Sequence, residues 1–304
     1  MISDGMDYKS ILSIGTLIIF GSFGSAIADK LRYTNYDIGD FQPIISGNWQ
    51  TSPYTERAKL DPAADPYLPL VVFAPGWSGA SKYQSAFKTI QKNLGAGFSY
   101  LYLDPSSKVD AATRTLNIFT AVSASQKQGL RPKEIIVVGA SGGAAEAMHA
   151  SHSLVSSRFP KIKITKVAAF YPTCRLQFTS KSSDKVKKLL FVGQKDQVAP
   201  AKLCSDMKAR GRLRNAKIVS YSAAGHSWLF KQTAKQRNET SYGNCTIEIN
   251  AKGRWSYNGT DSRNGIEPVL NRFVDECRTK AQSLTGRVNQ VYKDSLSKTI
   301  GFIR

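Results

Sequence analysis

The chain has 304 residues, of which 41% are hydrophobic and 21% are charged, and its formal net charge is +20 at pH 7. This length suits one large α/β domain, and the apolar content excludes a disordered chain. The basic clusters KIKITK and KSSDKVKK are short and scattered, which argues against a nucleic-acid-binding module. The charge therefore indicates either contact with anionic surfaces or only a solvated exterior.

Residues 1–28 have the pattern of a signal peptide. Lys9 precedes the apolar run ILSIGTLIIFGSFGSAIA, which ends in the small-x-small sequence of residues 26–28. Cleavage there would make Asp29 the first residue and would place the protein in the periplasm or outside the cell. The alternative is an uncleaved membrane anchor, because the run is about long enough to span a bilayer.

From residue 69 onward, short apolar runs alternate with longer amphipathic stretches. This alternation predicts an α/β fold with a mostly parallel central sheet and helices on both faces. The polar segment before it, residues 32–62, is predicted to form one or two edge strands. The predicted core strands are 69–74, 98–104, 134–140, 164–171, 187–193 and 216–223. The predicted helices are 81–94, 110–129, 142–158, 199–209 and, packing back on the sheet, 268–284.

Residues 231–266 do not follow the alternation. They contain two strand-like pieces around Asn250 to Gly253, which indicates a hairpin inserted into a single domain of residues 29–304. Two roles are open for this insertion: it forms part of the rim of a pocket, or it is a surface segment held by a disulfide.

Four cysteines follow the leader, and an even number in an oxidising compartment predicts two disulfides. Three connectivities are open. The pairing Cys174 with Cys204 and Cys245 with Cys277 is preferred, because each pair falls within one local region. Reduced structural cysteines are the alternative. No Cys-x-x-Cys spacing is present, so no metal site is expected.

Residues 139–143, Gly-Ala-Ser-Gly-Gly, match the pattern Gly-x-Ser-x-Gly. In this motif a strand turns sharply into a helix and exposes the serine hydroxyl. A predicted buried strand precedes the motif here and a predicted helix follows it, which is the context that the motif requires. Side chains at Gly139 and Gly143 would collide across the turn. Ser141 is therefore the candidate nucleophile.

His226 is the candidate base among three histidines. His149 and His152 lie in the helix that begins after Ser141, roughly 12 and 16 Å along its axis, so they cannot reach the hydroxyl. His226 directly follows the last strong strand. In a parallel sheet it therefore emerges at the same carboxyl-terminal edge as Ser141.

Asp196 is the candidate acid that orients the histidine. It lies in the loop after the strand predicted at 187–193, at the same edge of the sheet. Asp104 also ends a strand, but it precedes Ser141, and Asp184 lies before a strand at the opposite edge. Serine, acid, histidine is the chain order of the α/β-hydrolase fold, which favours Asp196.

An oxyanion hole needs two backbone N–H groups, one after the nucleophile and one from the loop after an earlier strand. Gly142 supplies the first. The second is expected from Trp77 in the sequence FAPGWSGAS, with Gly76 as the reserve candidate. Trp77 and Trp228 flank the proposed site, which suggests an apolar or aromatic acyl group.

The elbow, together with GQKDQVAP, AAGHSW, FAPGW and AAFYPTC, resembles the dienelactone hydrolase family of α/β-hydrolases over about residues 67–230. The resemblance implies a triad of Ser141, Asp196 and His226 and hydrolysis of an ester or lactone. Enzymes that act on dienelactone itself carry cysteine as the nucleophile, and Pro75 stands where the family often has histidine. These differences concern the substrate and leave the hydrolase mechanism intact.

The sequence thus predicts an exported serine esterase that acts on a small-molecule ester through an acyl-enzyme, without a metal or an organic cofactor. A serine peptidase is the nearest chemical alternative, because the same triad cleaves amides. A non-catalytic basic module that binds anionic envelope polymers is the alternative from another class.

Overall fold

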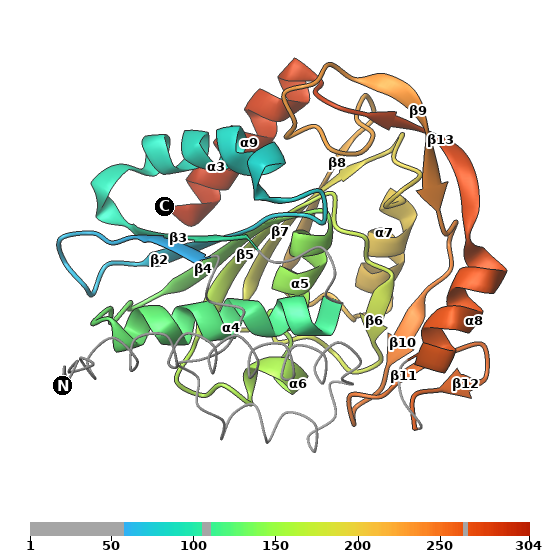
Figure 1. Ribbon diagram of the computed structural model, residues 1–304, viewed down its shortest axis with the longest axis horizontal. Helices are drawn as coiled ribbons and strands as arrows, with labels where there is room; N and C mark the ends of the chain where they lie inside the picture. Colours follow the sequence, from blue (N-terminus) through green and yellow to red (C-terminus); the bar gives the residue numbers. More distant parts are fainter. Residues whose placement is uncertain (1–57, 105–110, 264–266) are drawn as a thin grey trace, which may run out of the picture.

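The computed structural model describes residues 58–104, 111–263 and 267–304 (Figure 1). The signal peptide predicted for residues 1–28 lies outside these ranges, as does most of the segment 32–62. None of the helices within these ranges combines the length and the hydropathy needed to cross a bilayer.

The six predicted core strands and the edge strand β1, which falls in the segment predicted to form edge strands, make one seven-stranded sheet with the order β1-β3-β2-β4-β5-β7-β8. All neighbours are parallel except β1, which pairs antiparallel with β3 at the edge. The strands are β1 Ala58–Asp61, β2 Leu70–Ala74, β3 Ser99–Leu103, β4 Ile135–Ala140, β5 Ile164–Phe170, β7 Lys187–Gly193 and β8 Ala216–Tyr221. From β2 the chain passes through a helix to β3, which lies on one side of β2. It then passes through a second helix to β4, which lies on the other side of β2. The loops that follow β2 and β4 therefore meet at a switch point, where open α/β sheets bind ligands.

Helices cover both faces of the sheet, as the α/β-hydrolase fold requires (Figure 1). On one face lie α3 (Ala80–Leu94) and α9 (Asn289–Ile303), with the short 3₁₀ helix η2 (Gly95–Gly97) after α3. On the other lie α4 (Ala111–Lys127), α5 (Gly142–Ala150), α6 (Ser153–Ser156) and α7 (Ala201–Ala209). The five residues of β2, LVVFA, are all buried, with Val71 in one core and Val72 in the other. Both faces of such a strand are buried, so its side chains are apolar on both sides and do not alternate between apolar and polar.

A second layer, which we call the accessory layer, lies beside the carboxyl-terminal edge of the main sheet. It is a small sheet of order β12-β11-β10-β6 with α8 packed against it. Its elements are β6 Leu176–Phe178, β10 Ile247–Ile249, β11 Trp255–Tyr257, β12 Thr260–Asp261 and α8 Glu267–Cys277. The hairpin expected around Asn250 to Gly253 is the turn between β10 and β11. Buried residues of this layer join the core beneath α4 and α5.

The helix predicted over 268–284 is wrong beyond Cys277, where α8 ends. Residues Thr279–Thr285 instead form β13, which pairs antiparallel with β9 (Lys235–Ser241) over its whole length. The reason is tertiary, because this ladder supplies backbone hydrogen bonds that override local helix preference. The helix expected to pack back on the main sheet, α8, packs instead on β11 and β12. The last helix, α9, contacts β5 and β7 of the main sheet.

The helix predicted over 142–158 is divided into α5 and α6. The break lies at Ser151 and His152. His152 has an extended backbone, and its Nδ1 accepts a hydrogen bond from the Leu154 N–H at 3.2 Å. A side-chain acceptor at this position satisfies an unpaired N–H and begins a new helix.

Both disulfides are formed in the structure, in the pairing that the sequence favours. Cys174–Cys204 joins the loop after β5 to α7, and Cys245–Cys277 joins the loop before β10 to the end of α8. Their partners are 30 and 32 residues apart. Closing loops of this size stabilises a fold by roughly 3 to 4 kcal/mol each in the chain-entropy description.

Candidate active site

Ser141 lies at the sharp turn between β4 and α5, with φ 54° and ψ −119°. This backbone conformation is strained for a residue with a side chain. The turn is tight because Gly139 and Gly143 have no Cβ: one at Gly139 would collide with the Gly143 carbonyl, and one at Gly143 with the Ala74 carbonyl. The Ser141 N–H donates to the Phe170 carbonyl at 2.9 Å. The elbow therefore holds the hydroxyl at the carboxyl-terminal edge of the sheet.

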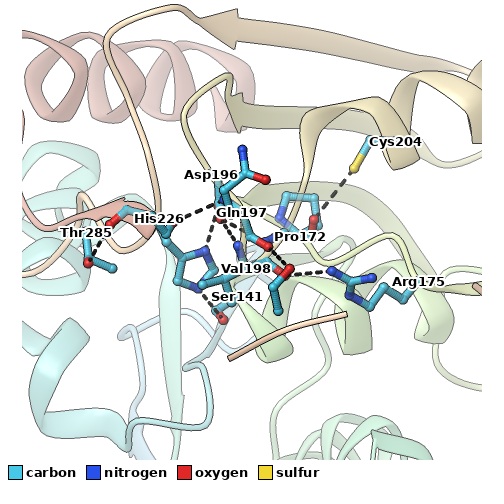
Figure 2. Close-up of polar contacts among 12 residues, drawn as sticks. Ser141, Pro172, Arg175, Asp196, Gln197, Val198, Cys204, His226 and Thr285 are labelled. Carbon is cyan, nitrogen blue, oxygen red and sulfur yellow. Dashed lines mark hydrogen bonds and ion pairs between the residues drawn. The ribbon is translucent and has the colours of Figure 1, made fainter. Parts of the chain in front are cut away.

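His226 faces Ser141 from the loop after β8 (Figure 2). Its Nε2 lies 3.0 Å from the serine Oγ, and its Nδ1 lies 2.7 Å from Asp196 Oδ2. The backbone around the ring is held by β13: the His226 N–H donates to the Leu284 carbonyl at 2.6 Å, and the His226 carbonyl accepts from the Gly286 N–H at 2.9 Å. The strand that replaces the predicted helix thus fixes the position of the histidine.

Asp196 follows β7 and is only 1% exposed. Its Oδ1 accepts hydrogen bonds from the Val198 and Ala199 N–H groups at 2.9 and 2.8 Å, so Oδ2 is left for the histidine. The next residue is held by the β9–β13 ribbon, because the Gln197 N–H donates to Ser283 Oγ at 3.1 Å. These bonds satisfy a buried carboxylate and fix its direction.

The alternative acids lie elsewhere in the structure. Asp104 is exposed at the rim of a separate cavity beside β1 and α3. Asp184 forms an exposed ion pair with Arg214 at 3.3 Å. The structure therefore brings only Asp196, of these three candidates, to His226.

The Trp77 loop lies directly against the elbow. A Cβ added at Gly142 would collide with the Trp77 indole, and one added at Gly76 would lie 2.9 Å from Ser141 Cβ. The segment that the sequence predicts to supply the second oxyanion donor is therefore adjacent to Ser141. Glycine is required at both positions for this close approach.

A buried ion pair between Arg114 and Glu146 lies behind the Trp77 loop. Arg114 is 1% exposed and Glu146 is 2% exposed, and Nε donates to Oε1 at 2.6 Å. The same Oε1 accepts from Trp77 Nε1 at 3.2 Å, and an Arg114 guanidinium nitrogen donates to the Pro75 carbonyl at 2.7 Å. Burial raises the pKa of the Glu146 carboxyl, and the adjacent guanidinium opposes this rise. The pair ties the loop after β2 to α5, the helix that follows Ser141.

Sequence reasoning missed this pair. Its signal was a single arginine in the otherwise uncharged first fifteen residues of α4, and a single glutamate in the alanine-rich α5. A charge that stands alone in a helix lined with buried residues needs a partner.

We expect Arg114→Met alone to lower the free energy of unfolding by about 3 to 5 kcal/mol, because Glu146 would stay buried without its partner. The double variant Arg114→Met/Glu146→Leu should regain most of this stability, since an apolar pair can replace a buried ion pair. Its kcat should nevertheless stay about 10- to 100-fold low, because Trp77 and Pro75 lose their anchors. Urea unfolding and ester turnover measure the two effects. A double variant with the kcat of the original protein would show that the pair serves stability alone.

The rings of His149 and His152 lie against Phe178 of β6, and His152 lies beyond the end of α5 rather than in the helix where the sequence predicts it. The Nε2 atoms of the two rings lie 3.2 Å from the Leu176 carbonyl and 3.3 Å from the Ser180 carbonyl, at the start and just beyond the end of β6. Burial lowers the pKa of each imidazole to about 4. Both rings are therefore neutral at pH 7 and hold the accessory layer against α5.

A cavity of about 600 Å³ opens over Ser141 and His226. Trp77 lines it and is 54% exposed. The suggestion that Trp228 also flanks the substrate is wrong: this residue is fully buried, donates from Nε1 to Ser295 Oγ at 3.3 Å and packs edge-on against Tyr171. The accessory layer provides the opposite wall of the cavity, so the insertion both lines the pocket and is stapled by a disulfide.

Within the three described ranges, no three His, Cys, Asp or Glu side chains gather in a way that could hold a metal ion. The site contains a serine, a histidine and an aspartate joined by two hydrogen bonds, next to a glycine-rich loop. This arrangement on a mostly parallel sheet defines an α/β-hydrolase.

Residues 101–246, which hold Ser141, Asp196 and His226, match the model of the dienelactone hydrolase family. This match supports a carboxylic ester hydrolase. The elements from α8 onward, including the β13 strand that holds His226, lie beyond the matched segment. No curated protein matches the chain.

Several solved structures are similar to part of the chain. Est1E from Butyrivibrio proteoclasticus, bound to ferulic acid, is 15% identical, with 58% of this chain and 88% of that chain covered and a TM-score of 0.44. Carboxyl esterase 2 from Tuber melanosporum is 16% identical, with 57% and 74% covered and a TM-score of 0.46. Esterase 2 from Thermogutta terrifontis, phosphonylated by cyclosarin, is 16% identical, with 57% and 80% covered and a TM-score of 0.44. These likenesses are loose, and the fold assignment rests on the strand order and elbow of this chain.

Proposed function

We propose that the protein is an exported serine esterase whose single α/β-hydrolase domain cleaves carboxylic esters or lactones through an acyl-enzyme. The observation that carries this proposal is the unbroken chain of hydrogen bonds from Ser141 Oγ through His226 to Asp196, with distances of 3.0 and 2.7 Å. Nucleophile and base at hydrogen-bond distance, with the base oriented by a third group, form the signature of nucleophilic catalysis.

In the first half-reaction, His226 Nε2 accepts the proton of Ser141 as Oγ attacks the carbonyl carbon. The backbone N–H groups of Gly142 and Trp77 stabilise the oxyanion, and Asp196 stabilises the imidazolium. His226 then donates its proton to the departing alcohol, and an acyl-Ser141 ester remains. In the second half-reaction, His226 deprotonates a water molecule that attacks this ester, and the proton returns to Ser141 as the acid leaves.

Export is supported by the leader-like residues 1–28 and by two disulfides, which persist in oxidising compartments. Cleavage after Ala28 would remove the leader. The large positive charge is compatible with attachment to anionic surfaces outside the cytoplasm.

A fluorophosphonate probe tests the nucleophile directly. We expect one covalent adduct per chain, and peptide mapping by mass spectrometry should place it on Ser141. The same unreduced sample reports the amino terminus and the disulfide pairs. A folded protein that takes up no probe would contradict the proposal and would favour a binding module with a blocked site.

A further inference from the structure

The cavity over Ser141 extends to the accessory layer. Ser141, Gly142 and His226 lie at the catalytic end. Five side chains from β10, β11 and α8 form the far wall, and all five are apolar: Ile247, Trp255, Leu270, Phe273 and Val274. Trp77, Phe230 and Tyr242 add further aromatic surface. A cavity of about 600 Å³ is in the range that encloses a ligand much larger than an acetyl group.

The far wall is preformed and firmly held. Cys245–Cys277 joins its two halves. Arg212 pairs with Glu248 of β10 at 2.8 Å. A wall fixed in this way does not have to be ordered by the substrate, so the burial of an apolar group there contributes fully to binding.

The cavity lining contains few charged side chains, among them Arg175, Arg237 and Glu239. The Arg175 guanidinium donates to the carbonyls of Tyr242, Gly243 and Cys245 at 2.9 to 3.1 Å. Arg237 and Glu239 carry opposite charges two residues apart on β9, and therefore on one side of the strand. Backbone carbonyls thus occupy donors of the Arg175 guanidinium, and most of the remaining lining offers apolar contact.

We infer, resting on the proposed function, that the substrate is a carboxylic ester with one large, uncharged, apolar side, either a long or branched chain or an arylalkyl group. This group lies against Trp255 and Phe273 while the ester carbonyl lies at Ser141. The large apolar group can belong to the acyl half or to the alcohol half of the ester. Each buried methylene is worth about a four-fold gain in transition-state binding.

Two ester series distinguish these halves. The first keeps the p-nitrophenyl leaving group and varies the acyl group through acetate, butyrate, octanoate and 4-phenylbutyrate. The second keeps acetyl and varies the alcohol through ethyl, octyl and 2-phenylethyl, with acid release followed by titration. We expect kcat/KM to rise at least 30-fold from the smallest to the largest member of one series. Two flat series would overturn the inference.

Leu270→Trp places a larger side chain in the cavity from α8. It should lower kcat/KM for the preferred large ester, relative to acetate, by at least ten-fold. Asn271→Trp, on the exposed side of the same helix, is the matched control and should leave this ratio unchanged. Val274→Phe repeats the test at a second lining position in case Leu270→Trp does not fold. An unchanged ratio in the folded lining variant would overturn the inference.

The two hypotheses fail in different ways. Absence of both p-nitrophenyl acetate turnover and fluorophosphonate labelling would overturn the proposed function, and the substrate class with it. Labelling at Ser141 and turnover of acetate, with no gain for larger esters, would overturn the substrate class alone.

Discussion

Replacing Ser141 with alanine is expected to lower kcat for p-nitrophenyl acetate by about 10⁵- to 10⁶-fold, because the acyl-enzyme then has no oxygen on which to form. The fold should remain, since the removed Oγ has its hydrogen bond to His226 and no role in the sheet. Removal of the hydroxyl also leaves the backbone strain at residue 141 unchanged, because the strain comes from the positive φ of this residue. Stopped assays at high enzyme concentration, with the disulfides intact, measure the residual rate.

Ser151→Ala is the matched control for this loss. Ser151 lies just after α5, is fully buried, and donates its hydroxyl to the Met148 carbonyl at 2.7 Å. Its replacement should affect stability slightly and leave kcat within about two-fold. Turnover by Ser141→Ala within ten-fold of the original rate would place the nucleophile elsewhere.

The sequence was sufficient to predict the core sheet and the meeting of Ser141, Asp196 and His226, because both depend on local features. Each core strand is a short apolar run, and parallel pairing brings all their carboxyl ends to one edge. The register aligns Ala140 with Phe170, and Gly193 with Tyr221. Residues that directly follow these strands, among them Ser141 and Asp196, therefore meet once the order of the strands is known.

Features that depend on distant contacts were not predictable. The segment of β13, TKAQSLT, has no apolar alternation of its own, and it becomes a strand because Thr279 to Thr285 pair with a strand about forty residues earlier. Trp228 was misplaced for a related reason. Ser227 has φ 62°, and this turn sends the next side chain into the core beneath α9 while His226 faces the site. Neither the ladder nor the turn has a recognisable local pattern.

Replacing Asp196 with asparagine is expected to lower kcat by about 10⁴-fold, or about 5.5 kcal/mol at 1.36 kcal/mol per factor of ten. The asparagine carbonyl can still accept from Val198 and Ala199, so the amide nitrogen faces His226 Nδ1. That nitrogen donates, and Nδ1 must accept. The proton is then on Nε2, which can no longer take the proton of Ser141.

The matched control is Asp104→Asn, at the end of β3 and exposed in a separate cavity. It should change kcat by less than two-fold. KM separates this tautomer effect from a change in the substrate pocket: Asp196→Asn removes stabilisation in the transition state, so kcat falls while KM changes little. If Asp196→Asn instead raised KM and kept kcat, the carboxylate would act in binding. The Asp196 carboxylate is held by the backbone N–H groups of its own loop, and the neighbouring Gln197 N–H donates to Ser283 of β13. The isosteric amide therefore tests the chemistry of the carboxylate while the β9–β13 ribbon stays in place.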